Sequence, residues 1–214
     1  MGEAGSLETL LVEYSKLLYN RGYVSSKNGN VTVVTDRGTV LVTPSSSCLG
    51  FLEPEDVVEV DMNGRRLAGK HDPSLELPLH LAVYRNRDEI KSVVHAHPPY
   101  VTAFSLLGRA PFENILPEFV VSVGNVEFVS FALPGSPELA SMVGKAASGA
   151  NALVLANHGA ITVGKDVEEA CMRMEDLEHT AKVQTIAEAL GELSRIGEKD
   201  LAFLRKFGKK SGRD

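Results

Sequence analysis

The stretch from Asn30 to Thr43 reads NVTVVTDRGTVLVT, and it decides the class of fold. Valine and threonine, which favour extended strands, dominate both halves of the stretch. The halves are separated by Asp36-Arg37-Gly38, a short polar segment that carries the glycine typical of tight turns. We therefore expect an antiparallel hairpin, with strands at 30–35 and 39–43, as the first part of a sheet.

Helix signals lie on both sides of this hairpin. Apolar side chains recur at helical spacing over residues 7–18, between Ser6, which can cap a helix, and Gly22, which can end one. Asp166 marks the start of a longer helix that we expect to reach about Leu190.

Strand and helix patterns alternate through the rest of the chain. They predict strands at 57–62, 92–97, 126–131 and 152–156, and helices at 73–85, 100–107 and 137–147. An early hairpin followed by helices throughout favours an α/β fold with a mixed, mostly antiparallel sheet covered by helices.

Length and composition fit one globular domain. A chain of 214 residues can bury a good core but is short for two domains. We expect a single domain over residues 1–214, with its core at about 7–190 and a C-terminal helix and basic tail at 191–214.

Charge and cysteine content exclude several classes of protein. The net charge of −6 argues against a nucleic-acid partner. Cys48 and Cys171 lack the spacing of a disulfide framework or a thiolate metal site. No stretch approaches the roughly 20 apolar residues that cross a bilayer, and the first residues lack a secretion signal. We expect no membrane partner and a cytoplasmic location.

His95 and His97 end the expected strand at 92–97 and give the sharpest chemical signal. Residues two apart on a strand project from one face, so both imidazoles can reach one metal ion. His158, in a turn after the strand at 152–156, supplies a third imidazole. Three neutral histidines with an open position are typical of catalytic zinc. One buried and two surface histidines remain the alternative, because spacing does not exclude them.

Glu76 stands near the start of the expected helix at 73–85, four residues before His80. A carboxylate there also suits the helix dipole without any catalytic role. Residues four apart share one helix face, so His80 could orient Glu76 or simply pack. If this face turns toward the histidines, Glu76 would bind the metal at rest and act as a base when substrate displaces it.

Two small polar loops lie at one edge of the predicted hairpin. They are Ser25-Ser26-Lys27-Asn28-Gly29-Asn30 and Thr43-Pro44-Ser45-Ser46-Ser47. Backbone N–H groups and hydroxyls in such loops can cradle an anion, although the same composition also makes ordinary turns.

Five motifs, taken in order, resemble the class II aldolase family. They are Asn28-Gly29-Asn30, Thr43-Pro44-Ser45-Ser46, Ser74-Leu75-Glu76 with His80, His95-Ala96-His97 and Asn157-His158-Gly159. The resemblance runs from about Leu7 to Leu190. It implies a three-layer α/β/α domain that assembles as a homotetramer.

The resemblance also implies roles for individual residues. His95, His97 and His158 would bind one Zn²⁺ per subunit, although three imidazoles suit other divalent ions as well. Glu76 would be the catalytic acid/base and would approach the metal in the resting enzyme. The residues implied to hold a substrate phosphate are Gly29, Asn30, Ser45, Ser46 and Ser74, with Lys27 and Thr43 as secondary candidates.

The implied reaction is reversible aldol cleavage of a ketose 1-phosphate similar to L-fuculose 1-phosphate. Its products are dihydroxyacetone phosphate and a short aldehyde. Zinc chemistry would stabilise the enediolate, and Glu76 would move the proton at the hydroxymethyl carbon. Two positions depart from the family pattern: Ser46 stands in place of a glycine and Leu75 in place of a serine. The charge of Lys27 could offset the missing hydroxyl.

Three alternatives stay open. A ribulose-phosphate 4-epimerase would resemble this chain but tends to carry Asp where Glu76 stands. A methylthioribulose-phosphate dehydratase would take its acid/base from the segment after the histidine pair, where Glu118 lies. A non-catalytic module similar to the adducin head would have lost the metal ligands, which this chain retains.

Overall fold

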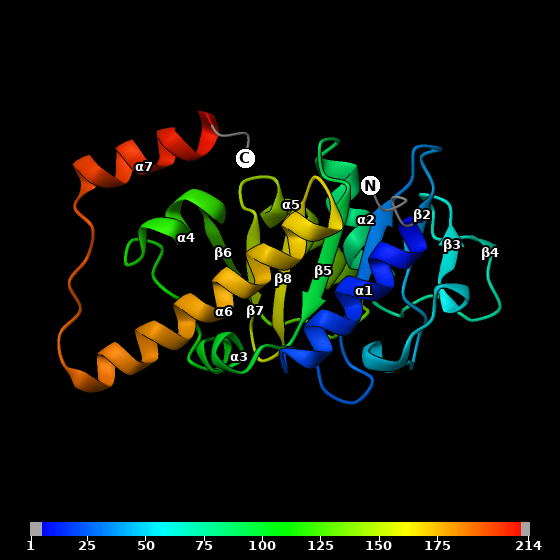
Figure 1. Cartoon of the computed structure of the whole chain (residues 1–214), viewed down its shortest axis with the longest axis horizontal. Coiled ribbons are helices and arrows are strands. Elements are labelled where there is room, and N and C mark those ends of the chain that lie inside the picture. Colours follow the sequence, from blue (N-terminus) through cyan, green and yellow to red (C-terminus); the bar gives the residue numbers. More distant parts are fainter. Residues whose placement is uncertain (1–5, 211–214) are drawn as a thin grey trace, which may run out of the picture.

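A computed structural model describes residues 6–210. Its eight-stranded sheet has the order β4-β3-β2-β1-β5-β8-β7-β6 (Figure 1). The strands are β1 (Asn30–Val34), β2 (Val40–Val42), β3 (Val58–Val60), β4 (Arg66–Ala68), β5 (Ser92–Ala96), β6 (Val126–Val129), β7 (Ala152–Leu155) and β8 (Gly159–Gly164). Neighbouring strands are antiparallel except for the parallel pair β6 and β7.

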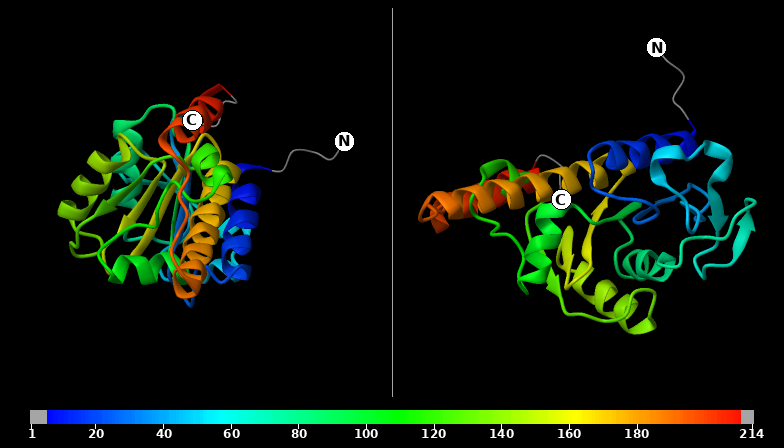
Figure 2. Two further views of the ribbon diagram at one scale, coloured as in Figure 1. Left: turned by 90° about the vertical axis from the view of Figure 1, so that its left-hand side faces the viewer. Right: turned by 90° about the horizontal axis from the view of Figure 1, so that it is seen from below.

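Helices cover both faces of this sheet. They are α1 (Leu7–Asn20), α2 (Leu77–Asn86), α3 (Pro99–Leu106), α4 (Pro117–Ser122), α5 (Pro137–Ala147), α6 (Val167–Leu190) and α7 (Glu198–Lys210), with short 3₁₀ turns η1 (Leu49–Phe51) and η2 (Pro54–Asp56). Figure 2 shows the sheet between α1 and α6 on one face and α2 and α5 on the other. Two apolar clusters fill the two interfaces. The expected three-layer α/β/α fold is confirmed.

The predicted hairpin is present, because β1 and β2 pair with Thr32 opposite Val42. Ser6 also caps α1 as expected, since its side chain accepts the N–H of Thr9. The helix expected from residue 73 instead begins at Leu77. Pro78 fits its first turn, and the preceding residues form an irregular approach.

Three elements were absent from the sequence prediction: β4, β8 and α4. Strand β8 begins and ends with glycine, which weakens the strand signal, yet it pairs with both β5 and β7. Helix α4 spans 6 residues, too few for a helical period to be read with confidence from sequence.

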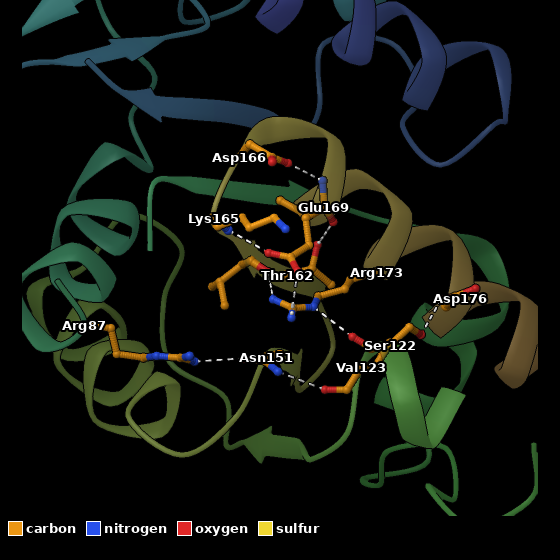
Figure 3. Close-up of polar contacts among 12 residues, drawn as sticks. Arg87, Ser122, Val123, Asn151, Thr162, Lys165, Asp166, Glu169, Arg173 and Asp176 are labelled. Atoms are coloured by element: carbon orange, nitrogen blue, oxygen red, sulfur yellow. Dashed lines mark hydrogen bonds and ion pairs between the residues drawn. The ribbon is translucent and has the colours of Figure 1, made fainter. Parts of the chain in front are cut away.

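A buried arginine joins α6 to the sheet, as Figure 3 shows. The Arg173 side chain is 2% exposed and donates to the carbonyl oxygens of Val163 at 2.7 Å and Ser122 at 2.9 Å. It also contacts Glu169 at 3.3 Å, one turn earlier on α6. These contacts fix the first half of α6 against β8 and the end of α4.

The described part of the expected basic tail is helical. Helix α7 includes Lys206, Lys209 and Lys210, whereas Arg213 lies outside the described residues. Within residues 6–210, no helix combines the length and apolar character that crossing a membrane requires.

Candidate functional site

Three imidazoles converge at one end of the sheet. The nearest ligand atoms of His95, His97 and His158 all lie within 4.8 Å of one another. Nε2 of His95 and Nε2 of His97 are 3.0 Å apart. The structure therefore brings together all three histidines that the sequence singled out.

His95 lies near the end of β5 and is fully buried. Its Nδ1 lies 3.0 Å from the carbonyl oxygen of Ala160 on the neighbouring strand β8. Because a carbonyl only accepts, Nδ1 carries a proton, and Nε2 is left as the ring nitrogen that would face a metal ion. The fixed tautomer is the one that a metal ligand needs.

His97 lies one residue beyond the last residue of β5, so the expected strand is shorter than predicted. Its backbone N–H donates to the carbonyl oxygen of Tyr23 at 2.9 Å. The imidazole sits directly over Gly159, where an added Cβ would meet His97 Cδ2 at 2.6 Å and the Ala96 carbonyl oxygen at 2.5 Å. Only glycine leaves room for the ring at this point.

His158 lies in the turn between β7 and β8, as the sequence indicated. Its N–H donates to the carbonyl of Leu155 at 3.1 Å, and Asn157 before it has φ 56°. Asparagine tolerates this left-handed backbone better than most residues, and the tight turn directs His158 toward the other two histidines.

Glu76 occupies the N-cap position of α2 and faces the same cluster. Oε2 lies 3.1 Å from Nε2 of His95, and Oε1 lies 3.4 Å from Nε2 of His158. Burial alone would raise the pKa of Glu76, but the charge and hydrogen bond of His95, helped by His158 and Asn30, hold this pKa well below its usual range. The carboxylate is therefore charged beside the three rings.

The residues fit a divalent metal ion. Ligand atoms around a tetrahedral ion with bonds of about 2.0–2.1 Å are about 3.3 Å apart. The separation between His95 and His97, 3.0 Å, and the two contacts of Glu76, 3.1 and 3.4 Å, lie close to this value, and the three imidazole ligand atoms all lie within 4.8 Å of one another. Among the described residues, none donates a hydrogen bond to the buried Oε1 of Glu76, which suits an oxygen that faces a cation.

The protonation of the rings also fits. Burial, with the nearby charge of His95, lowers the pKa of His97 to about 3 and that of His158 to about 4. Burial would lower the pKa of His95 too, but the charge of Glu76 raises it. At neutral pH His97 and His158 are in the neutral form that binds metals.

His80 does not hold Glu76, contrary to one of the expectations. Its Nδ1 lies 2.8 Å from the hydroxyl of Thr32, which is also 2.6 Å from the hydroxyl of Tyr84. Glu76 precedes the first turn of α2, so the two residues do not stack on one helix face. His80 instead belongs to a buried polar group beneath the site, and burial lowers its pKa to about 3.

A cavity of about 580 Å³ opens beside the histidines. It is lined by Lys27, Asn28, Gly29, Asn30, Pro44, Ser45, Ser46, Ser74, Leu75, Glu76, His97, Pro134, Gly135 and His158. The two polar loops of the hairpin thus meet at the site and bring five of the expected phosphate-loop positions to its wall, and Ser74 joins them from the segment before α2. The loop before α5, with Pro134 and Gly135, was not anticipated, because nothing local in its sequence points to a ligand.

Two of the expected site residues, Thr43 and Glu118, are not among the residues that line this cavity. The Thr43 side chain is fully buried, and its hydroxyl accepts the N–H of Val31 at 3.1 Å. It therefore secures β1 to the end of β2. Glu118 lies in the first turn of α4, away from this cavity.

Comparisons with known proteins point to one family. Residues 9–185 match the family model described as Class II Aldolase and Adducin N-terminal domain. An L-fuculose phosphate aldolase of Methanococcus maripaludis (strain C7) is 40% identical over 82% of this chain and 94% of the relative. A 3-oxo-tetronate 4-phosphate decarboxylase of Pectobacterium atrosepticum is 38% identical over 81% of each chain.

Solved structures give the same grouping. The Escherichia coli protein YgbL, titled a putative aldolase/epimerase/decarboxylase, superposes with a TM-score of 0.88 at 34% identity, over 94% of this chain and 98% of that chain. A structure titled L-fuculose 1-phosphate aldolase superposes with a TM-score of 0.89 at 28% identity, over 97% of this chain and 100% of the other.

Proposed function

Because the chain belongs to the class II aldolase and adducin N-terminal domain family, we propose that it catalyses reversible aldol cleavage of a ketose 1-phosphate. The substrate would be similar to L-fuculose 1-phosphate, and the products would be dihydroxyacetone phosphate and a short aldehyde. The observation that carries this proposal is the cluster of Glu76 and three histidines at the wall of a cavity with small polar loops.

His95, His97 and His158 would hold the ion, which we propose to be one Zn²⁺ per subunit, with Glu76 as a fourth ligand at rest. When bound, the ion would draw electron density from the substrate ketone and stabilise the negative charge that develops there. Other divalent ions suit three imidazoles as well.

Glu76 is the proposed acid/base. In the synthetic direction it would take a proton from the hydroxymethyl carbon of dihydroxyacetone phosphate, and in cleavage it would return that proton. Asn30 contacts Oε2 of Glu76, so Oε1 is the oxygen left to carry the proton. Its buried position keeps bulk water away from the transfer.

The polar loops would bind the substrate phosphate. Gly29 and Asn30 contribute backbone N–H groups, and Ser45, Ser46 and Ser74 contribute hydroxyls at the cavity wall. Lys27 supplies positive charge there and would offset the hydroxyl lost where Leu75 replaces serine. The homotetramer, the single domain over 1–214 and the cytoplasmic location belong to the same proposal.

A second candidate is decarboxylation of a 3-oxo-tetronate 4-phosphate, the reaction named for one group of relatives. Loss of C1 as CO₂ leaves a carbanion at C2 beside the C3 ketone. Protonation of C2 then gives dihydroxyacetone phosphate, so both candidate reactions share one enediolate and require one proton from the same carboxyl group. They differ only in whether an aldehyde or CO₂ departs.

The two candidates are separated by their second product. Zn²⁺-loaded protein is incubated with L-fuculose 1-phosphate and, separately, with a 3-oxo-tetronate 4-phosphate. We expect dihydroxyacetone phosphate and an aldehyde from the first substrate. Release of CO₂ from the second, with no cleavage of the first, would favour the decarboxylase. An absence of dihydroxyacetone phosphate from both would contradict the proposed use of this enediolate.

A further inference from the structure

We propose that Glu178, on α6, is a positioning residue that sets His97 in the metal centre by clamping the start of α3. This inference rests on the proposed metal site. Oε1 of Glu178 accepts the N–H of Tyr100 and Oε2 accepts the N–H of Val101, both at 2.9 Å. One carboxylate thus binds two consecutive backbone donors, 78 and 77 residues away in sequence.

Helix α3 needs a cap from outside its own sequence. Pro98 is its N-cap residue and Pro99 is its first residue, and prolines have no N–H to donate. Tyr100 and Val101 therefore carry the first two N–H groups of the helix, and the side chain at the N-cap, Pro98, cannot accept them. Val101 is fully buried, so its N–H would have neither water nor protein acceptor without Glu178.

Of the three histidines, His97 depends most on this cap. The ring of His95 is held by the carbonyl of Ala160, and His158 lies in a three-residue connection between paired strands. His97 has left the ladder of β5, and within residues 6–210 its ring hydrogen-bonds only to His95. Its position is therefore set by its backbone.

That backbone is fixed at two points. On one side, the His97 N–H donates to the carbonyl oxygen of Tyr23, near the start of the segment that follows α1. On the other side, two rigid prolines lead directly into the clamped turn of α3. Release of the clamp would free the second point and allow His97 to turn away from His95 and His158.

Helix α6, which carries Glu178, is itself held in place, and the Glu178 carboxylate is buried at a cost in stability. Arg173, a little over one turn earlier on α6, ties the helix to β8 and the end of α4 (Figure 3). Glu178 itself is 5% exposed, and burial raises its pKa, which the bonds to Tyr100 and Val101 partly oppose. A buried carboxylate is rarely the most stabilising choice for a core position. Its use here is consistent with a need for exact placement of α3.

The test is the affinity for Co²⁺, followed by its visible absorption in the chelator-stripped, refilled full chain. In Glu178→Gln, one N–H of α3 would face an amide NH₂ group instead of an acceptor. We expect Co²⁺ binding about 10- to 100-fold weaker, the range typical when an outer-shell contact of a metal site is lost, with a changed absorption spectrum. If this variant does not fold, Glu178→Asp, which keeps the charge but is shorter by one methylene, is measured with the same expectation.

A matched control and a double-mutant cycle separate positioning from general stability. Glu188→Gln removes a charge from the same helix at a residue that pairs with Arg109, and its Co²⁺ affinity should stay within about two-fold of wild type. In a His97→Ala background, Glu178→Gln should cause no further loss, because its effect passes through His97.

Three results would overturn the inference. Glu178→Gln with wild-type affinity and spectrum, even if less stable to urea, would make Glu178 a stabilising cap only. An equal loss of affinity with and without His97 would show that it acts elsewhere. A wild-type protein that binds no Co²⁺ would contradict the metal site itself, and with it this inference.

Discussion

The side-chain amide of Asn30 donates a hydrogen bond to Oε2 of Glu76, with 3.1 Å between the two heavy atoms. Asn30 begins β1 and lies opposite His95 in the adjacent strand β5. Its side chain is nearly buried, and only an NH₂ group can face a carboxylate oxygen. The first polar loop is thus joined directly to the proposed acid/base.

This contact predicts a defect in catalysis more than in phosphate binding. Asn30→Ala should lower kcat for proton exchange on dihydroxyacetone phosphate about 10- to 100-fold, because Glu76 loses one of the contacts that hold it. Inhibition by inorganic phosphate should change less than about three-fold. Ser45→Ala is the matched control, with the opposite pattern expected. Weaker phosphate inhibition with normal kcat in Asn30→Ala would instead make its side chain a phosphate ligand.

Gly159 predicts a second effect on the metal centre. In Gly159→Ala, the new methyl group would overlap the His97 ring and the Ala96 carbonyl, so both must shift. We expect at least about 10-fold weaker Zn²⁺ binding in a chelator competition, and about 1–3 kcal/mol less stability from overpacking. Gly149→Ala adds a methyl group that meets nothing within 4 Å and should bind Zn²⁺ normally. Equal affinities of the two variants would contradict the role assigned to Gly159.

Ser46 holds the backbone conformation of the glycine that it replaces. Its φ is 57°, in the left-handed region that costs a non-glycine residue about 1–2 kcal/mol. Glycine relieves that strain but gains freedom in the unfolded chain, so Ser46→Gly should raise the free energy of unfolding by about 0.5–1 kcal/mol. Urea denaturation measures this change. Ser45→Gly, at a position without positive φ, should destabilise; stabilisation of both variants alike would exclude the strain explanation.

Acid should destabilise the metal-free protein through His80. Burial holds its pKa at about 3 in the folded chain against 6.5 in the unfolded chain. Between these two pKa values the unfolded state therefore takes up a proton that the folded state does not. With respect to His80, the free energy of unfolding is highest above pH 6.5 and decreases as the pH falls toward 3. Between these values His80 contributes a slope of about 1.4 kcal/mol per pH unit.

The measurement is the free energy of unfolding in urea at pH 6, 5.5 and 5, in the presence of chelator. His80→Gln should be less stable at pH 7 but should show a slope smaller by nearly that amount. His97 and His158 act in the same direction and His95 in the opposite one, so wild type is compared only with this variant. Parallel curves for the two proteins would contradict a neutral, buried His80.

Local patterns in the sequence predicted much of this fold. The hairpin at Asn30–Val34 and Val40–Val42, the capped start of α1 and the histidine pair at the end of β5 each depend on residues close in sequence. We expected His158 to lie near that pair, because the pair and His158 each stand at the end of a strand that the sequence predicts to be buried. By contrast, β8 was missed because its glycines weaken its strand pattern, and it is stabilised by two neighbouring strands.

The missing parts of the site are tertiary contacts of polar residues. Asn30 and Glu76 are 46 residues apart in sequence, and Glu178 is 78 residues from Tyr100, whose N–H it binds in α3. On α6, Arg173 and Glu178 read as ordinary surface charges, yet both are buried. Helical periodicity does not reveal such residues, because their acceptors and donors come from other elements. For the same reason, the sequence left open whether His80 orients Glu76 or simply packs, and the structure places its ring against Thr32.

The most direct test of the proposed chemistry is deuterium incorporation into dihydroxyacetone phosphate in D₂O, followed by NMR. Zn²⁺-loaded protein should exchange one proton of the hydroxymethyl carbon, chelator should stop the exchange, and Zn²⁺ should restore it. Glu76→Gln should bind Zn²⁺ and remain folded, but should exchange at least about 100-fold more slowly. Exchange that survives chelation, or that persists in Glu76→Gln, would contradict the central claim that a metal and Glu76 form this enediolate together.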